Sequence, residues 1–181
     1  ADFDRGNGWN WNPTNLPYLG VSALQGSSLT LYSSLYNLRY FYFNSFSGTW
    51  FSQFGDLAKF EYISADAQFR LTETDGTVFL FHDMTHVSRP GGFVEMSSPG
   101  GTVLSVVQES GNRIIELLRT VTIGSDTSRE SFVYEYITSG DLDGHFLNVT
   151  ARRSLNGSSW ANVSRVSYTY YPDGDNSGSL G

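Results

Sequence analysis

One stretch, Phe69–Asp83, constrains the fold of this chain more than any other. It reads FRLTETDGTVFLFHD, two runs of strand-forming residues on either side of an Asp-Gly pair. Asp-Gly is a frequent centre of a two-residue hairpin turn, in which both residues take positive φ. Apolar and polar residues alternate in the first run, whereas the second run is apolar on both faces. The stretch predicts a β-hairpin with Asp75 and Gly76 at positive φ and a second strand covered on both sides.

Similar runs recur along the chain, at 112–123, 132–137 and 160–171. The turn markers Gly76, Gly111, Gly144 and Gly174 stand 35, 33 and 30 residues apart. Regular spacing of one supersecondary unit is typical of repeat architectures. We therefore expect an all-β fold, an antiparallel sheet of successive hairpins that is repeat-like and either curled or a sandwich.

The most apolar stretch, 22–46, is dominated by tyrosine and phenylalanine. Ser33-Ser34 or Asn37 can divide it into two strands. A helix over Leu29–Tyr40 is the alternative, but the β-branched and aromatic content favours strands. The predicted organisation is an irregular lead-in at 1–20, a single β-repeat domain at 21–172 and a Gly/Ser linker-like tail at 173–181.

Composition excludes several classes of function. The chain has one Lys and ten Arg, a net charge of −7 and acidic residues spread along its length. Nucleic-acid binding is disfavoured, because it needs clustered cations. The absence of Cys excludes disulfides, thiolate nucleophiles and zinc–thiolate sites. No apolar run approaches the roughly 20 residues of a membrane span. Ala1–Arg5 is acidic and polar, unlike a signal peptide, as expected of a mature form or a fragment.

Several motifs resemble the YD-repeat (Rhs) family. They are Thr74–Thr77 closed by Phe81–Asp83, then Ser98–Gly101, Gly111–Ile114, Tyr134–Tyr136 and Tyr168–Gly174. The similarity extends over residues 6–174, although no Tyr-Asp pair occurs. Proteins of this family are large and secreted or surface-attached, and their repeats pair into a long curling sheet that can enclose a cargo. Their catalytic chemistry sits in separate terminal domains. The resemblance implies a structural scaffold segment without catalysis, bacterial and secreted or at the cell surface, that pairs with neighbouring copies or adjoining repeats.

His82, Asp83 and His86 form the one closely spaced histidine pair with a carboxylate, a combination that can bind a metal or serve acid–base chemistry. A spacing of four residues is expected to bring side chains together only on a helix, however, and this segment is expected at the end of a strand. Local packing of the two histidines is therefore the favoured interpretation. No metal site and no cofactor are predicted.

Acidic residues of the hairpin region could supply a glycosidase pair, whose carboxylates stand about 5–10 Å apart. The candidates are Glu61, Asp66, Glu73 and Asp75. Residues of this kind are expected more often on a solvated face or in a turn. No catalytic residue is predicted, and the chain is not expected to be an enzyme.

Two features of the sequence are connected with glycans. Asn148, Asn156 and Asn162 each begin a glycosylation acceptor pattern. Asn156-Gly157 is also the expected turn of a hairpin joining 146–154 to 159–171. A carbohydrate-binding β-module is the alternative function, because exposed coplanar indoles can stack on sugar rings. The candidate rings are Trp9, Trp11, Trp50 and Trp160, the first two of which could instead seal the end of a sheet.

The stretch Trp160–Tyr171 alternates side chains regularly and follows the other predicted strands. An edge strand exposes unpaired N–H and C=O groups, which proteins usually protect with Lys, Pro or charge. The chain has a single Lys, and its five Pro lie near its ends and in two loops. We therefore expect 160–171 to be an edge strand that another copy or repeat continues by strand addition.

Overall fold

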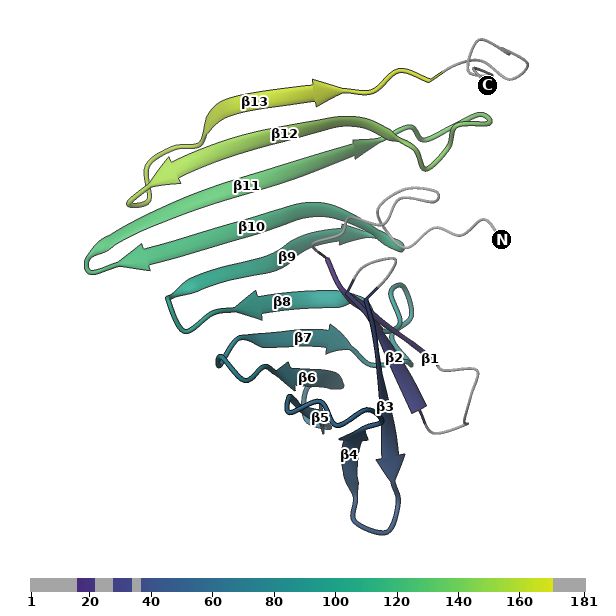
Figure 1. Ribbon diagram of the computed structural model, residues 1–181. Coiled ribbons are helices and arrows are strands. Elements are labelled where there is room, and N and C mark those ends of the chain that lie inside the picture. The colour runs from purple at the N-terminus through teal and green to yellow at the C-terminus, as the bar shows by residue number, and fades with distance from the viewer. Residues whose placement is uncertain (1–15, 22–27, 34–36, 171–181) are drawn as a thin grey trace, which may run out of the picture.

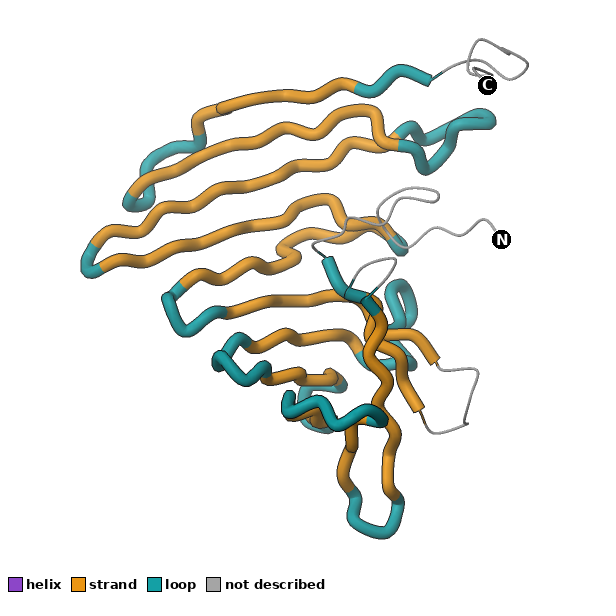
Figure 2. Tube along the Cα trace, viewed as in Figure 1, coloured by secondary structure: helices purple, strands orange, loops and turns teal. Residues whose placement is uncertain are grey.

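The computed structural model describes residues 16–21, 28–33 and 37–170. These residues form thirteen strands in two antiparallel sheets and contain no helix (Figures 1 and 2). The expected all-β antiparallel fold is confirmed. Strands β2 (Ser28–Tyr32) and β3 (Leu38–Asn44) flank the expected break in 22–46, so the alternative of a helix over 29–40 is wrong. In the part of the chain that is described, nothing helical is long and apolar enough to cross a membrane.

The smaller sheet has the order β1-β2-β3-β4, where β1 is Tyr18–Val21 and β4 is Thr49–Ser52. Strand β1 occupies the end of the stretch 1–20 that was expected to be irregular, and residues 1–15 lie outside the described ones. The ring of Tyr18 stacks on that of Tyr32 across the ladder, with 4.6 Å between centroids. Pairing with β2 therefore makes β1 a strand, although Pro17 before it and Gly20 within it are residues that disfavour strands.

The larger sheet is a nine-stranded meander in which each strand pairs with its neighbours in the chain. Its strands are β5 (Lys59–Ile63), β6 (Gln68–Thr72), β7 (Val78–His82), β8 (Phe93–Ser97), β9 (Thr102–Ser110), β10 (Arg113–Ile123), β11 (Asp126–Tyr136), β12 (Phe146–Leu155) and β13 (Ala161–Ser167). Strands β5 to β8 have five residues each, whereas β10 and β11 have eleven. The sheet therefore fans out towards its C-terminal side (Figure 1).

The predicted hairpin is present as β6 and β7, but its turn differs from the prediction. Only Gly76 has positive φ (+86°), and Asp75 does not. The N–H of Glu73 donates to the carbonyl of Thr77, and the N–H of Gly76 donates to that of Glu73. The loop thus has three residues, 74–76, in the pattern of a type I turn followed by a left-handed residue. The carboxylate of Asp75 accepts the N–H of Thr77 at 2.8 Å, a side-chain contact that stabilises this turn.

The turn predicted at Asn156-Gly157 is confirmed. Both residues have positive φ, +49° and +78°, as a two-residue type I′ turn requires. The turn joins β12 to β13 as expected, although β13 ends at Ser167 and is shorter than the predicted strand.

The core lies between the smaller sheet and one face of the larger sheet, here called the inner face. Register aligns Phe60, Leu71 and Phe79 in one row across β5 to β7, and a second row contains Phe69, Phe81 and Phe93. From the smaller sheet, Leu19, Leu31 and Phe41 pack against these rows. Strands β2 and β3 cross the strands of the larger sheet rather than running along them (Figure 1).

On the outer face, Val78 and Leu80 are only half-buried. Among the described residues, the cover that was expected on both sides of the second hairpin strand is present on the inner face alone. The second run is apolar because Phe79 and Phe81 enter the core, while Val78 and Leu80 contact neighbours within their own sheet.

The loop 83–92 joins the two sheets. The N–H of Leu19 donates to the carbonyl of Gly91 at 2.8 Å, which links β1 to the β7–β8 connection. Gly91 has φ of +68°, and a Cβ at this position would collide with the backbone of Leu19. A glycine is required here because the two backbones approach too closely for any side chain.

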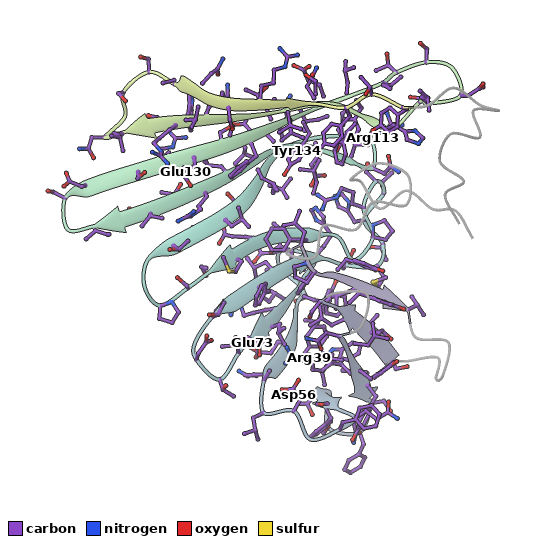
Figure 3. The ribbon with its side chains drawn as sticks, turned by 45° about the horizontal axis from the view of Figure 1, so that its top comes forward. Arg39, Asp56, Glu73, Arg113, Glu130 and Tyr134 are labelled. Atoms are coloured by element: carbon purple, nitrogen blue, oxygen red, sulfur yellow. The ribbon has the colours of Figure 1, made fainter. Side chains whose placement is uncertain are left out.

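Beyond the core, β11 to β13 continue the sheet past the smaller one (Figures 1 and 3). Of the described residues in the main core, none comes from β12 or β13. A separate aromatic group closes one end of these strands, where Phe146 contacts Tyr134, Tyr136 and Tyr168 with centroids 5.1–5.8 Å apart. Burial raises the pKa of Tyr134 to about 12.

Candidate functional site

Strand β13 is the outermost strand of the larger sheet, and all seven of its residues are exposed. It pairs with β12 on one side. The N–H of Tyr168 donates to the carbonyl of Leu147 at 3.0 Å, just beyond the paired residues Ser167 and Asn148. Because N–H directions alternate along an antiparallel strand, the N–H groups of Ser167 and Arg165 point to the free edge.

The edge is not uniform. A register shift between Ala151 and Arg152 places a β-bulge near Val163, in the first half of β13. Bulges and charged side chains are devices that limit pairing at sheet edges. The regular part of the edge is therefore Ser164–Ser167, and its cation, Arg165, contacts Glu135 at 3.3 Å. The sequence predicted the edge strand but not the bulge that shortens it.

The outer face of the larger sheet carries a polar cluster over β10 to β12. Ser131 is fully buried (0% exposed), and its Oγ donates to Oε1 of Glu116 at 2.5 Å. Oε1 of Glu116 also accepts a hydrogen bond from Nη2 of Arg152 at 2.7 Å. The guanidinium groups of Arg152 and Arg129 lie 5.0 and 5.2 Å from the ring centroid of Trp160. The indole therefore covers a charge network and stacks on two cations.

Other charged residues on the long strands are paired too. The carboxylate of Glu130, labelled in Figure 3, forms ion pairs with Arg119 at 3.1 Å and with Arg153 at 2.6 Å. These three side chains come from adjacent strands at matched register positions. Exposed pairs of this kind contribute about 0–1 kcal/mol each, so they hold the strands in register more than they stabilise the fold.

The rings of His82 and His86 stack, with 3.7 Å between centroids and 13° between planes. The expectation that their spacing could bring them together only on a helix is wrong. Loop 83–92 turns back on itself instead: the carbonyl of Asp83 accepts the N–H of His86 at 3.4 Å and that of Gly91 at 3.1 Å. The expected local packing of the pair is what the loop produces.

Glu109 connects this pair to a buried arginine. Its carboxylate forms an ion pair with Arg89 and lies 3.5 Å from Nε2 of His82. Arg89 also donates to the carbonyl of Phe93 at 2.9 Å, while its buried Nε has no hydrogen-bond partner among the described residues. Burial and the neighbouring His86 lower the pKa of His82. No group of three or more His, Asp or Glu among the described residues is arranged to hold a metal ion.

The four carboxylates considered for a glycosidase pair each have a local role. Glu61 pairs with Lys59 at 2.7 Å on β5, and Asp75 caps the hairpin turn. Glu73 binds Arg39, and Asp66 lies exposed in the β5–β6 turn, where its N–H donates to Ile63. Their contacts are those of surface, turn and bridging residues.

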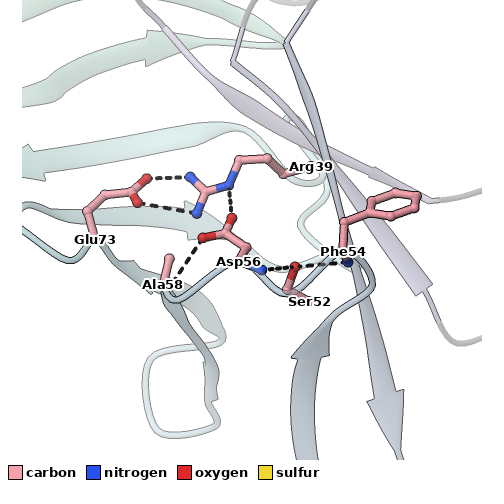
Figure 4. A network of polar contacts seen from close by, with 6 residues as sticks. All are labelled: Arg39, Ser52, Phe54, Asp56, Ala58 and Glu73. Atoms are coloured by element: carbon pink, nitrogen blue, oxygen red, sulfur yellow. Dashed lines mark hydrogen bonds and ion pairs between the residues drawn. The ribbon is translucent and has the colours of Figure 1, made fainter.

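Glu73 belongs to an ion-pair network that bridges the two sheets (Figure 4). Arg39 on β3 binds the carboxylates of both Asp56 and Glu73. Burial opposes ionisation of Asp56, but the Ala58 N–H and the Arg39 guanidinium outweigh it and lower the pKa of Asp56. Nothing in the sequence pattern indicates this bridge, because its members are 17 and 34 residues apart.

The three glycosylation candidates lie in different surroundings. Asn148 is 6% exposed, donates from Nδ2 to Glu135 at 2.5 Å and accepts Ser167 Oγ at 2.7 Å. Asn156 and Asn162 are exposed, the first in the β12–β13 turn and the second on β13. In the folded chain the amide nitrogen of Asn148 is thus enclosed, and only the other two present an accessible side chain.

The structure does not bring Trp50 and Trp160 together. Trp50 lies on β4, whereas Trp160 precedes β13 at the far side of the larger sheet, and Trp9 and Trp11 lie outside the described residues. Trp50 meets Phe60 and Phe69 edge-to-face and lines two adjoining surface grooves with Phe43 and Tyr62. These grooves, at the junction of β4 and β5, were not predicted.

Comparison of the chain with protein-family models, with curated proteins and with solved structures finds no match.

Proposed function

We propose that this chain is a non-catalytic scaffold segment, part of a β-sheet wall that continues through the edge of β13. The single observation that carries the proposal is that edge. Strand β13 ends a nine-stranded meander, is exposed along its whole length and turns the N–H groups of Arg165 and Ser167 away from β12. A scaffold needs such an edge, because backbone pairing extends a sheet without a specialised pocket.

The long strands support the same role. Their charged side chains are engaged in cross-strand pairs, as in Arg119–Glu130–Arg153 and Glu116–Ser131–Arg152. Such pairs connect neighbouring strands to one another without a second layer, which is what a thin wall requires. The partners proposed for β13 are neighbouring copies or adjoining repeats, as the resemblance to YD-repeat proteins implies, in a bacterial protein that is secreted or at the cell surface.

Sedimentation velocity of the 181-residue chain over a wide concentration range tests the proposal. We expect concentration-dependent association. Arg165→Pro should abolish it, because proline removes an N–H from the free edge and leaves the bonds to β12 intact. Arg165→Thr is the matched control: it removes the same charge, keeps the N–H and should still associate. A chain that stays monomeric at every concentration would overturn the proposal.

Carbohydrate binding is the second candidate, favoured by the position of Trp50 in the groove that also contains Lys59, Glu61 and Tyr62. Isothermal titration with cellobiose tests it, with Trp50→Leu as the variant that should lose the binding.

A further inference from the structure

The junction of the two sheets contains a small groove with aromatic walls and one acidic end. Its volume is about 350 Å³. The walls are Phe43 of β3, Trp50 of β4, Tyr62 of β5 and Phe69 of β6, together with Met84. Asp83 and Thr85 supply the polar end. Four consecutive strands from two sheets thus contribute one aromatic ring each.

The rings stand at steep angles to one another and do not form a flat platform. Phe43 and Trp50 make an angle of 50°, with centroids 5.4 Å apart, and Trp50 and Phe69 make an angle of 89° at 5.6 Å. Phe69 and Tyr62 follow at 49° and 5.1 Å. Phe69 is buried and also stacks on Phe60 at 5.4 Å and 9°, so it backs the groove from the core. The rings of Phe43, Trp50 and Tyr62 are the ones that can present a negative π face or a ring edge to a guest.

The acidic end carries a charge that no cation of the described residues balances in an ion pair. Asp83 is 7% exposed. Its Oδ1 accepts the N–H and the Oγ1 of Thr85 at 2.9 and 2.8 Å, and its Oδ2 accepts the hydroxyl of Tyr62 at 3.1 Å. The hydrogen bonds from Thr85, together with the one from Tyr62, lower the pKa of Asp83 against the opposing effect of burial. The carboxylate is therefore ionised near neutral pH.

The chemistry of the groove discriminates between guests. A sugar ring needs several directional partners for its hydroxyl groups, but Asp83, Thr85 and Tyr62 already bond to one another. A bare ammonium group is strongly hydrated and would lose its water against apolar walls. A methylated ammonium group is weakly hydrated, is attracted by aromatic faces and gains from a nearby carboxylate.

We propose that the groove formed by Phe43, Trp50, Tyr62, Phe69 and Asp83 binds a quaternary ammonium group. The rings hold the methyl groups and share the positive charge, and Asp83 provides the counter-charge. The second groove shares Phe43, Trp50 and Tyr62 with the first and adds Lys59 and Glu61, in a volume of about 470 Å³. It receives the polar substituent that such a ligand carries. This site is independent of the β13 edge and of the scaffold role.

Titration with choline, followed by NMR of the tryptophan indole N–H signals, tests the proposal. The matched probe is 3,3-dimethyl-1-butanol, which has the shape of choline without its charge. We expect choline to bind at least about tenfold more tightly than this alcohol, with the largest shift at Trp50, because the attraction of a desolvated cation to aromatic rings is of that size. Trp50→Leu, which keeps an apolar side chain but removes the indole, should abolish binding, whereas Trp160→Leu should not change it.

Asp83→Asn tests the counter-charge and should weaken choline binding by about tenfold while leaving the binding of the alcohol unchanged. Because Asp83 also organises loop 83–92, the amide spectrum of this variant is compared with that of the parent. If the loop is disturbed, Tyr62→Leu tests the ring walls instead: it removes one aromatic ring, keeps the Asp83 carboxylate and should also weaken choline binding. Equal affinity for choline and the alcohol, or shifts at Trp50 with cellobiose but not with choline, would overturn the proposal.

Discussion

The layered region, β1 to β9, and the extended region, β11 to β13, are parts of one fold held together in different ways. In the layered region, aromatic rows of the larger sheet pack against Leu31 and Phe41 of the smaller one. In the extended region, Ser131, Glu116 and Arg152 bond across strands, and every residue of β13 is exposed. At the boundary, Leu117 of β10 lies in the core and Phe132 and Tyr134 of β11 pack against it, whereas Glu116 of β10 is on the outer face.

The difference shows what a sheet needs when no second layer covers it. Burying one large apolar side chain contributes about 1.5–3 kcal/mol, whereas a cross-strand pair contributes about 0.2–1 kcal/mol. The extended region therefore depends on many weak pairs along strands of up to eleven residues. Its local stability should be lower than that of the layered region, and it should open first.

The largest expected effect comes from breaking the layered region. Phe41 is 1% exposed and stacks on Phe60 at 4.5 Å between the two sheets. Phe41→Ala should lower the free energy of unfolding by about 3–5 kcal/mol, because it removes buried apolar area and leaves a cavity. Chemical denaturation measures the change. Phe46→Ala is the control: Phe46 is 99% exposed, and its loss should change stability by less than about 0.5 kcal/mol.

A smaller and more local effect is expected in the extended region. Ser131→Ala removes the hydrogen bond to Glu116 and a partner of Arg152 from a fully buried position. We expect a loss of about 1–3 kcal/mol, which hydrogen exchange should locate in β10 to β12 and not in β5 to β8. Ser125→Ala, in the exposed β10–β11 turn, should leave exchange unchanged. Uniformly faster hydrogen exchange in both regions would contradict the division of the fold into a layered and an extended region.

The smallest expected effect is a pH dependence of folding stability that arises from His82, next to loop 83–92 in the layered region. Because burial and His86 lower the pKa of His82, the unfolded chain binds a proton at that residue more readily than the folded chain does. Stability should then fall as pH drops below the ordinary histidine value near 6.5, by at most about 1.4 kcal/mol for each unit by which the pKa is lowered. Denaturant midpoints measured from pH 7.5 to 5.5 check this, and His82→Gln should flatten the slope. If the stability of His82→Gln depends on pH as steeply as that of the parent, His82 is not the source of the pH dependence.

Much of the fold could be predicted from local sequence signals. The strand-forming run at 112–123 is present as β10, Arg113–Ile123, and the turn expected at Asn156-Gly157 joins β12 to β13. The first half of β11, 126–131, was missed because its sequence, DTSRES, has no apolar periodicity. That half lies in the extended region, where cross-strand polar pairs replace burial. Hydrophobic patterning detects strands that face a core, and these residues do not face one.

The candidate sites were harder to predict from the sequence for a related reason. The groove at Trp50 joins residues from four strands, and the Arg39 bridge joins residues up to 34 positions apart. Such groupings depend on how two sheets pack, which no local motif specifies. The His82–His86 contact shows the converse: a known spacing gave the wrong expectation because loop 83–92 turns sharply enough to stack the rings without a helix.

The strictly sequential order of the larger sheet has a consequence for how the chain folds. From β5 to β13, each strand finds its partner in the segment made immediately before or after it. Closing short loops costs little chain entropy, and topologies dominated by local contacts fold faster than those that join distant segments. Each new hairpin can dock on the strand already in place, so the sheet can grow in the order of synthesis. A sheet with this order can be lengthened by adding strands at its end without altering those already folded.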